Sequence, residues 1–530
     1  MIMCIIKIMP QATPGRADPL WRKLIIGVVV LAVCVFVSGP GWANNIEVSS
    51  VKRFSQVPGS HWMVQFNILW TNSWRCDLAG AGQSAPYNYD AAWVFMKYRT
   101  NVSAGAWGEW KHASLSTSVS DHVAPAGSTI NVGMSPTTND AGETATNGIG
   151  VFIYRGANGY GLFTANKVQL RWNYPSDSVA DSAGLEVKVC AIEMVYVPTG
   201  AFYLGSTTDG TEANRFYAGD AGGVSTNTPF LVTNENYQVE IGNAAGQLFY
   251  ITNNTYGGDQ AGILSNAFPK GFNAFYGMKY EITQGQYVDF LNIINSNQAS
   301  YRWYATAIPN NRYAITNVSG SYASSNLYVA CNYMSWADLA AYLDWAGLRP
   351  MTELEFEKAC RGTNYPVAQE YAWGNSTFPT YPTGITNNGA ANEAPSNTTA
   401  NCNSEFQTYV QGPMRVGCMG IGNGTRARTG AGYYGMMELS GNLFERTVTV
   451  GNADGRSFSA VHGNGVLSSN GDADVTCWPG SSASGAGYRG GGWGYNSSSP
   501  EVKTANRGRS AETRNDRSVY CGGRGVRSAP

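Results

Sequence analysis

Short runs with a strand-like pattern dominate the first third of the chain. In three of them hydrophobic and polar residues alternate, and two others are short and apolar. Clusters of Gly, Asn, Ser and Pro separate the runs, and no helical period interrupts them. Since alternation gives a strand one buried and one exposed face, the pattern predicts an all-β sandwich over residues 44–193. The runs are 64–70, 92–98, 151–154, 168–172 and 185–189.

The pattern changes after Met194, where capping residues mark three helix starts. Each start has a Ser or Thr, then a Gln, Asp or Glu three positions later, and then apolar residues on one face. Gly347 and Gly362 stand where the second and third helices are expected to end. The rest of residues 194–530 is loop-rich, and loops on that scale need disulfides, metal ions or a function that maintains them. The capping pairs are Thr283 with Gln286, Ser335 with Asp338, and Thr352 with Glu355.

The first 43 residues have the pattern of a signal peptide. A basic stretch ends at Lys23, the apolar run 24–37 follows, and small residues precede Asn44. The apolar run is shorter than the roughly 20 residues that a membrane span needs. We therefore expect an exported protein, in the periplasm, on the cell surface or outside the cell. It would associate with a membrane only if this segment stayed uncleaved.

Composition narrows the range of partners. A chain of 530 residues is too long for one ordinary core, so more than one domain is expected. The formal net charge of −1 argues against a nucleic-acid partner, which normally requires a strongly basic surface. Seven arginines between Arg489 and Arg527 are a local exception. We expect them to fix loops through carboxylates and backbone carbonyls.

Eight cysteines follow the predicted signal peptide. An even number in an exported chain favours disulfides. A bond between Cys402 and Cys418 would close a local loop, and one between Cys76 and Cys190 would join the ends of the first domain, but the sequence leaves the connectivity open. The other four are Cys331, Cys360, Cys477 and Cys521.

Several motifs after residue 193 occur in the order found in one known family. The region resembles the formylglycine-generating enzyme and sulfatase-modifying family, a variant of the C-type lectin fold, from Met194 to Arg527. The resemblance implies an α+β protein in which the N-terminal β-sandwich, residues 44–193, precedes a loop-rich, lectin-like domain, residues 194–530. The segments that carry it are Met194–Pro198, Gly200–Gly205, Tyr280–Tyr287, Met334–Trp336, Leu348–Phe356, Tyr371–Asn375, Ser440–Glu445, Arg489–Trp493 and Gly525–Arg527.

The resemblance does not carry over the family's chemistry. The enzyme binds copper through two cysteines after its Arg-Gly-Gly segment, and Tyr495 and Pro500 stand at the matching positions. Neither is a soft metal ligand. The iron-dependent branch uses several histidines, and His462 alone lies in this region, where we interpret it as structural. We identify no catalytic residue; an enzyme of the family with unrecognised chemistry is one alternative.

The family also has a calcium site that matches this chain better. Calcium is held there by an Asx side chain, two backbone carbonyls and the glutamate of a Gly-Asn-x-Trp-Glu segment. The resemblance implies a structural calcium ion at Glu438, Gly441, Leu443 and Glu445, and oxygen ligands suit such a cation. The alternative is that the two carboxylates pair with arginines such as Arg446.

The family further includes target proteins of diversity-generating retroelements, which display a hypervariable C-terminal surface. Adenine-directed mutagenesis there cannot produce Trp, Met, Gln, Lys or Glu, and none of these occurs in residues 494–499 or 515–522. The interpretation is a surface or periplasmic ligand-binding or adhesion protein that recognises a protein or glycan on a cell surface; a structural envelope protein is a further alternative. The predicted ligand-binding residues are Tyr495, Asn496, Ser498, Asn515, Asp516, Ser518 and Tyr520.

Overall fold

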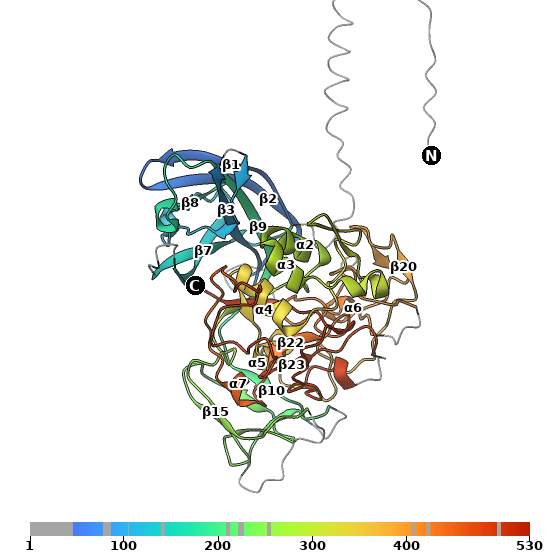
Figure 1. Ribbon diagram of the computed structural model, residues 1–530. Helices are drawn as coiled ribbons and strands as arrows, with labels where there is room; N and C mark the ends of the chain where they lie inside the picture. Colours follow the sequence, from blue (N-terminus) through green and yellow to red (C-terminus); the bar gives the residue numbers. More distant parts are fainter. Residues whose placement is uncertain are drawn as a thin grey trace, which may run out of the picture. The chain divides into compact units, whose positions relative to one another are not determined.

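The computed structural model describes most of the chain after residue 45 (Figure 1). The predicted signal peptide, residues 1–43, lies outside the described residues. Within the described part, no helix combines the length and the apolar character needed to cross a membrane. The described residues are 46–77, 86–103, 105–138, 142, 144–207, 212–220, 227–251, 256–404, 409–420, 424–495 and 500–530.

Every strand-like run predicted for the first region lies in a β-strand. Four further strands, β1, β4, β5 and β6, were not predicted from the sequence pattern. The strands are β1 (Glu47–Val57), β2 (His61–Arg75), β3 (Asp90–Ser103), β4 (Ala106–Trp107), β5 (Lys111–His112), β6 (Ser128–Thr138), β7 (Thr144–Arg155), β8 (Gly159–Trp172) and β9 (Leu185–Val197).

One large sheet joins the two predicted regions. Among the described residues, β1, β2 and β8 form a three-stranded sheet, while a larger sheet runs in the order β19-β24-β16-β9-β3-β7-β6. Its strands β16 (Phe275–Met278), β19 (Arg349–Pro350) and β24 (Gly525–Ser528) come from the second region. The boundary predicted after residue 193 falls inside β9, which pairs with β3 on one side and β16 on the other. The division into a separate sandwich and lectin-like domain stays a prediction.

Strand β3 is buried on both faces. Ala92, Val94 and Met96 belong to a cluster shared with β2 and β8. Trp93 and Phe95 point the opposite way, into the cluster that contains the helices of the second region. Because successive side chains of a strand alternate between faces, β3 contributes to two cores at once.

The three helices predicted from capping residues are confirmed. Each begins after the predicted Thr or Ser, and each has a complete capping box. A further capping box, formed by Asn295 and Gln298, starts a helix that was not predicted. The longer helices are α2 (Gln284–Ile293), α3 (Ser296–Arg302), α4 (Trp336–Trp345) and α5 (Glu353–Arg361), and two single turns are α6 (Arg426–Thr429) and α7 (Ala453–Arg456).

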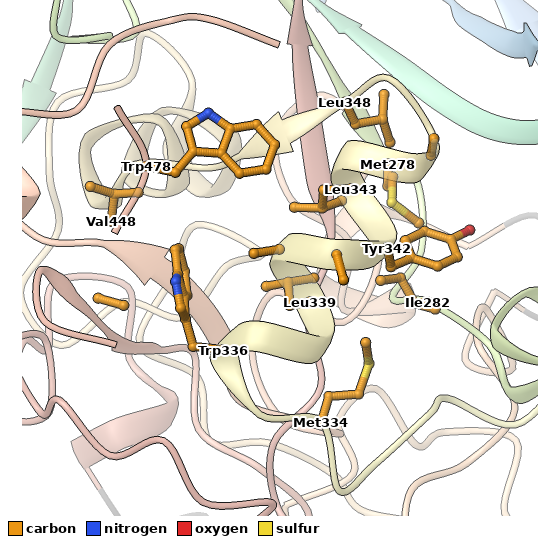
Figure 2. Packing of buried hydrophobic residues seen from close by; sticks show 14 of the residues in the cluster. Met278, Ile282, Met334, Trp336, Leu339, Tyr342, Leu343, Leu348, Val448 and Trp478 are labelled. Atoms are coloured by element: carbon orange, nitrogen blue, oxygen red, sulfur yellow. The ribbon is translucent and has the colours of Figure 1, made fainter. Parts of the chain in front are cut away.

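Helix α4 lies at the centre of the larger core. Figure 2 shows Tyr342 beside Met278 and Ile282, with Trp336 on the side of Val448. All ten residues of the helix are buried, so it has no solvent-exposed face. Helix α4 is therefore a core element around which the loops are arranged.

The remaining strands are short, and the structure is a β-rich α+β fold, as predicted. Most contain two to four residues and pair locally. They are β10 (Phe202–Leu204), β11 (Phe216–Ala218), β12 (Phe230–Val232), β13 (Val239–Ile241), β14 (Leu248–Tyr250), β15 (Gly262–Leu264), β17 (Ile315–Val318), β18 (Ser321–Ser324), β20 (Ile385–Thr386), β21 (Ala394–Pro395), β22 (Glu445–Val448) and β23 (Ala486–Arg489).

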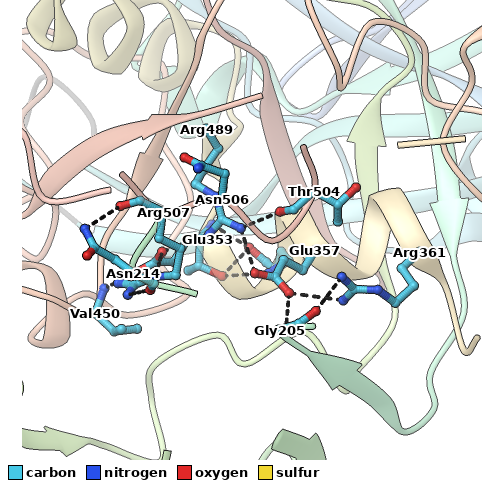
Figure 3. A network of polar contacts seen from close by, with 12 residues as sticks. Gly205, Asn214, Glu353, Glu357, Arg361, Val450, Arg489, Thr504, Asn506 and Arg507 are labelled. Carbon is cyan, nitrogen blue, oxygen red and sulfur yellow. Dashed lines mark hydrogen bonds and ion pairs between the residues drawn. The ribbon is translucent and has the colours of Figure 1, made fainter. Parts of the chain in front are cut away.

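Buried ion pairs hold the loops of the second region. Glu353 of α5 accepts hydrogen bonds from Arg489 at 2.9 Å and from Arg507 at 2.7 Å, and all three side chains are fully buried (Figure 3). Glu357, one turn along the helix, accepts from Arg489 at 2.7 Å and from Arg361 at 3.1 Å. Carboxylates on one helix thus fix segments more than one hundred residues away.

The seven C-terminal arginines fix loops, as expected from the sequence. Six of them pair with a carboxylate, and Arg527 donates to backbone carbonyls of Gly347 and Met134. Their five partners are Glu353 for Arg489 and Arg507, Glu512 for Arg509, Asp516 for Arg514, Asp338 for Arg517, and Glu445 for Arg524.

The predicted disulfides are wrong. None of the eight cysteines of the described residues forms a disulfide bond. Cys402 and Cys418 belong to different apolar clusters, and the thiol of Cys402 lies 3.1 Å from the carbonyl oxygen of Ser440. Cys76 and Cys190 do not bond either. The core and the buried ion pairs supply the cross-links that disulfides were expected to provide.

The buried indole of Trp493 allows a test of packing in the second region. Its side chain has no exposed surface and donates from Nε1 to the carbonyl of Val519 at 3.2 Å. Replacing Trp493 by Ala should lower the free energy of unfolding by about 3–5 kcal/mol, because it leaves a large cavity. The measurement is denaturant unfolding, with Tyr160→Ala as control at a side chain that is 71% exposed. A loss below about 1 kcal/mol for Trp493→Ala would contradict its place in the core.

Candidate functional site

The C-terminal loop, residues 513–520, is fixed from beneath by a buried arginine. Arg446 of β22 is 1% exposed and donates to the carbonyls of Arg514 at 3.0 Å and Asp516 at 2.9 Å. The hydroxyl of Tyr488 on β23 also donates to the Arg514 carbonyl, at 3.1 Å. The backbone of the loop is therefore held by side chains of the protein interior.

A second anchor fixes the loop from the side of helix α4. Arg517 donates two hydrogen bonds to the carboxylate of Asp338, at 2.7 and 2.8 Å. Asp338 is 1% exposed and belongs to the capping box of α4. A two-point guanidinium–carboxylate contact restricts orientation as well as position. Asn515 and Asp516, between the two anchors, are exposed.

Aromatic side chains line the neighbouring surface. The rings of Tyr495 and Tyr520 lie 5.5 Å apart, and Tyr520 also packs against the buried Trp493 at 5.2 Å. Tyr495 contacts Phe444 at 5.0 Å. Both tyrosines are half-buried, so each combines a fixed ring with accessible surface.

The structure brings together several predicted ligand-binding residues. Tyr495 and Tyr520 are in contact, while Asn515, Asp516 and Ser518 belong to the anchored loop. The Asp516 carboxylate pairs with the exposed Arg514 at 2.6 Å. Two further predicted residues, Asn496 and Ser498, lie outside the described residues.

Sequence reasoning missed two tyrosines beside this loop. The backbone N–H of Tyr333 donates to the Ser518 carbonyl at 3.2 Å, and the rings of Tyr333 and Tyr304 lie 5.7 Å apart. The guanidinium of Arg517 lies over the Tyr304 ring at 5.3 Å. Both tyrosines are half-buried. The signal available was the aromatic-rich stretch around residues 301–313, which does not by itself reveal its neighbour 200 residues later.

A buried acidic cluster surrounds the predicted calcium residues. Glu445 is fully buried and pairs with Arg524 at 2.5 Å, not with Arg446. Glu438 accepts from the Gly417 N–H at 2.8 Å. A third carboxylate, Glu281, was not predicted: it accepts from the Leu443 N–H at 2.8 Å and from the side chain of Asn442.

The charges in this cluster are not balanced. Burial raises the pKa of Glu438 to about 7, although Arg524 opposes the shift. Burial also raises the pKa of Glu445, and it raises that of Glu281 well above its ordinary value, with help from the neighbouring carboxylates. Two arginines, Arg524 and Arg415, thus act on three acids. One oxygen of Glu438 and one of Glu445 are buried without a hydrogen-bond partner.

Oxygen chemistry at this cluster fits a hard cation. Gly441, in the same turn, has a φ of 84°, and Leu443 is fully buried. Within the described residues, no group of three or more His, Cys, Asp or Glu side chains has a metal-binding arrangement. A cation here would therefore use the two unpartnered carboxylate oxygens together with backbone carbonyls.

His462 lies apart from both features. Its Nε2 accepts a hydrogen bond from the Ser528 N–H at 2.9 Å. Burial lowers the pKa of His462 well below its ordinary value, and nearby Arg527 and Arg349 lower it further. A neutral, buried histidine that accepts a backbone hydrogen bond is consistent with the structural interpretation.

The second region is thus a β-rich scaffold whose loops are fixed by arginines. Residues 186–529 match the model of the sulfatase-modifying factor enzyme 1-like domain, which covers more than half of the chain. The chain therefore belongs to this family, and the resemblance stated from the sequence is confirmed. A comparison with curated proteins found no match.

The two positions that correspond to the copper-binding cysteines, Tyr495 and Pro500, have roles in packing and in local backbone structure. The Tyr495 ring packs against other aromatic rings, and Pro500 begins a short 3₁₀ helix, Pro500–Val502. We expect purified protein with copper to leave the cysteine of a sulfatase-type peptide unchanged, because no thiolate pair stands at these positions. Mass spectrometry of the peptide measures this, with a copper-loaded formylglycine-generating enzyme as positive control. Formation of formylglycine would contradict the expectation.

Proposed function

We propose that the protein is an exported ligand-binding or adhesion protein. Its binding face consists of Tyr495, Tyr520 and the loop 513–520, together with Asn496 and Ser498. The observation that carries the proposal is the loop held by two anchors, the buried Arg446 and the ion pair of Arg517 with the buried Asp338, which leave Asn515 and Asp516 exposed. A backbone fixed from inside tolerates changes of its outward side chains, since loop residues lie outside the packed layers.

The composition of this face supports recognition of a protein or glycan on a cell surface. Tyr, Ser and Asn are the residues of adaptable binding loops, because a tyrosine offers large contact area at low entropic cost. The residues that adenine-directed mutagenesis cannot produce are missing from segments 494–499 and 515–522. This pattern supports a diversified face, and a template repeat beside a reverse-transcriptase gene at the locus would corroborate it.

The binding face can be tested with one combined variant. Replacing Tyr495, Asn515, Asp516, Ser518 and Tyr520 by Ala should abolish binding to whole cells and to protein and glycan arrays. The single changes at the exposed Asn515 and Asp516 should alter stability by no more than about 0.5 kcal/mol. The exposed Tyr160→Ala, remote in the chain, is the control that should keep binding. Unchanged binding by the combined variant would refute the proposed face.

We further propose that Glu438, Gly441, Leu443 and Glu445 hold a calcium ion with a structural role. The two unpartnered carboxylate oxygens and the crowding of three buried carboxyl groups, whose pKa values are raised, support it. Bound calcium would supply positive charge where two arginines act on three acids. It would also order a turn that carries Glu445 into β22, the strand of Arg446.

Calcium should raise the melting temperature of the purified chain. At about 100 times its dissociation constant the ion would add roughly 2.7 kcal/mol to the free energy of unfolding. Chelator should reverse the shift, and Glu445→Gln should remove both the shift and the bound metal. Glu186→Gln, at a partly exposed carboxylate that pairs with Arg99, is the control. A melting temperature that chelator leaves unchanged would rule the site out.

A further inference from the structure

A cavity of about 380 Å³ lies where the strands of the first region meet the helices of the second. One wall comes from β3, β5, Thr137, Thr138, Ala145 and Asn147. The other comes from the ends of α2 and α4 and from residues 464–467. Its volume is within the range of small-ligand sites, roughly 300–1,000 Å³. It shares no lining residue with the proposed C-terminal binding face.

Lys97 of β3 forms part of the cavity wall without a carboxylate partner. Its side chain is 1% exposed, and Nζ donates to the carbonyls of Trp345 at 2.7 Å and Gly465 at 3.4 Å. Lys279, another buried lysine, pairs with two carboxylates at 3.1 and 3.3 Å. Among the ion pairs of the described residues, none includes Lys97.

The surroundings of Lys97 compensate its positive charge only in part. Burial lowers the pKa of Lys97 to about 7, and Cys190 and Asp344 offset this only in part. The Asp344 carboxylate already accepts the N–H groups of Asn464 at 2.9 Å and Asp474 at 3.0 Å. An ammonium has three N–H donors, and the two carbonyls account for two of them.

The rim of the cavity offers groups that suit a hydroxylated molecule. Hydroxyl and amide side chains there can both donate and accept hydrogen bonds. Apolar surface from Trp110 and Val466 lies among them and suits the carbon skeleton of a sugar. The polar lining residues include Thr137, Thr138, Asn147, Ser176, Asn295, Gln298 and Asn464, and the charged Glu109, Lys111 and Asp177 also line the cavity.

We propose that this cavity binds a sugar acid, a hydroxylated carboxylate of monosaccharide size, whose carboxylate pairs with Lys97. The Gly465 carbonyl is at the long limit of a hydrogen bond, so a carboxylate oxygen replaces it with a gain in charge neutralisation. The rim amides and hydroxyls bind the hydroxyl groups. A neutral sugar of the same shape leaves the Lys97 charge uncompensated and binds more weakly.

Glucuronate and glucose test this directly, since they differ by a carboxylate in place of a hydroxymethyl group. Titration calorimetry of the full chain at pH 7 should show binding of glucuronate and at least about tenfold weaker binding of glucose. Glucuronate binding should take up protons, seen as heats that depend on the ionisation enthalpy of the buffer. Equal affinities for the two sugars, or no binding of glucuronate, would overturn the proposal.

Matched variants identify the group responsible. Lys97→Met should abolish glucuronate binding and its proton uptake, whereas Lys111→Met, at an exposed lysine of the same cavity, should retain both. Retained binding by a folded Lys97→Met variant would overturn the proposal. The combined alanine variant of the C-terminal face should bind glucuronate normally, so the two proposals fail independently.

If Lys97→Met does not fold, the pH dependence of binding by the wild-type chain tests the role of Lys97 instead. Protonated Lys97 binds the carboxylate, so affinity should fall by up to about tenfold per pH unit above pH 7. Other titratable groups near Lys97 or the cavity are Cys190, His112, Glu109, Lys111, Asp177 and Asp344. Because burial also raises the pKa of Asp344 to about 7, Asp344→Asn is the control. A pH profile that is flat, or that Asp344→Asn flattens, would overturn the role of Lys97.

Discussion

The buried carboxylate of Glu353 is the contact on which the loop-rich region depends. It accepts from Arg489 and Arg507, which lie 136 and 154 residues further along the chain, and from the N–H of Val450. Removing one partner of a buried ion pair leaves an uncompensated charge, at a cost of about 3–5 kcal/mol. The specificity of such contacts matters as much as their energy. A carboxylate buried on a rigid helix accepts only segments that bring a guanidinium to it in the right direction.

The strand pairing of β3 and β9 is the second constraint. Both faces of β3 are covered, one by the strands before it and one by helix α4 and its neighbours. The indole of Trp93 donates to the carbonyl of Ala346 at the end of α4, at 2.8 Å. The first region is therefore tied to the helices by side-chain packing as well as by the shared sheet. A substitution that destabilises one region is therefore expected to destabilise the other.

Local features of the fold were readable from the sequence, whereas long-range partners were not. Thr283, Ser335 and Thr352 mark helix starts because a cap and its partner are three residues apart. The carboxylate that pairs with a given arginine, such as Asp338 with Arg517, depends on the fold of distant segments. The local sequence around the arginine does not indicate which carboxylate this is. At the candidate site, motif order gave Glu438 and Glu445, but Glu281 comes from a distant segment. The disulfide prediction failed because cysteine number and cellular location say nothing about distance between thiols.

The buried thiols can be used to measure local opening of the fold. Burial raises the pKa of Cys360, Cys402 and Cys418, so these thiols are poor nucleophiles while the fold is closed. They belong to separate clusters, and each becomes reactive only when its own surroundings open. The chain thus contains built-in probes of local opening. Their rates of alkylation, resolved residue by residue, map which part of the interior loosens first.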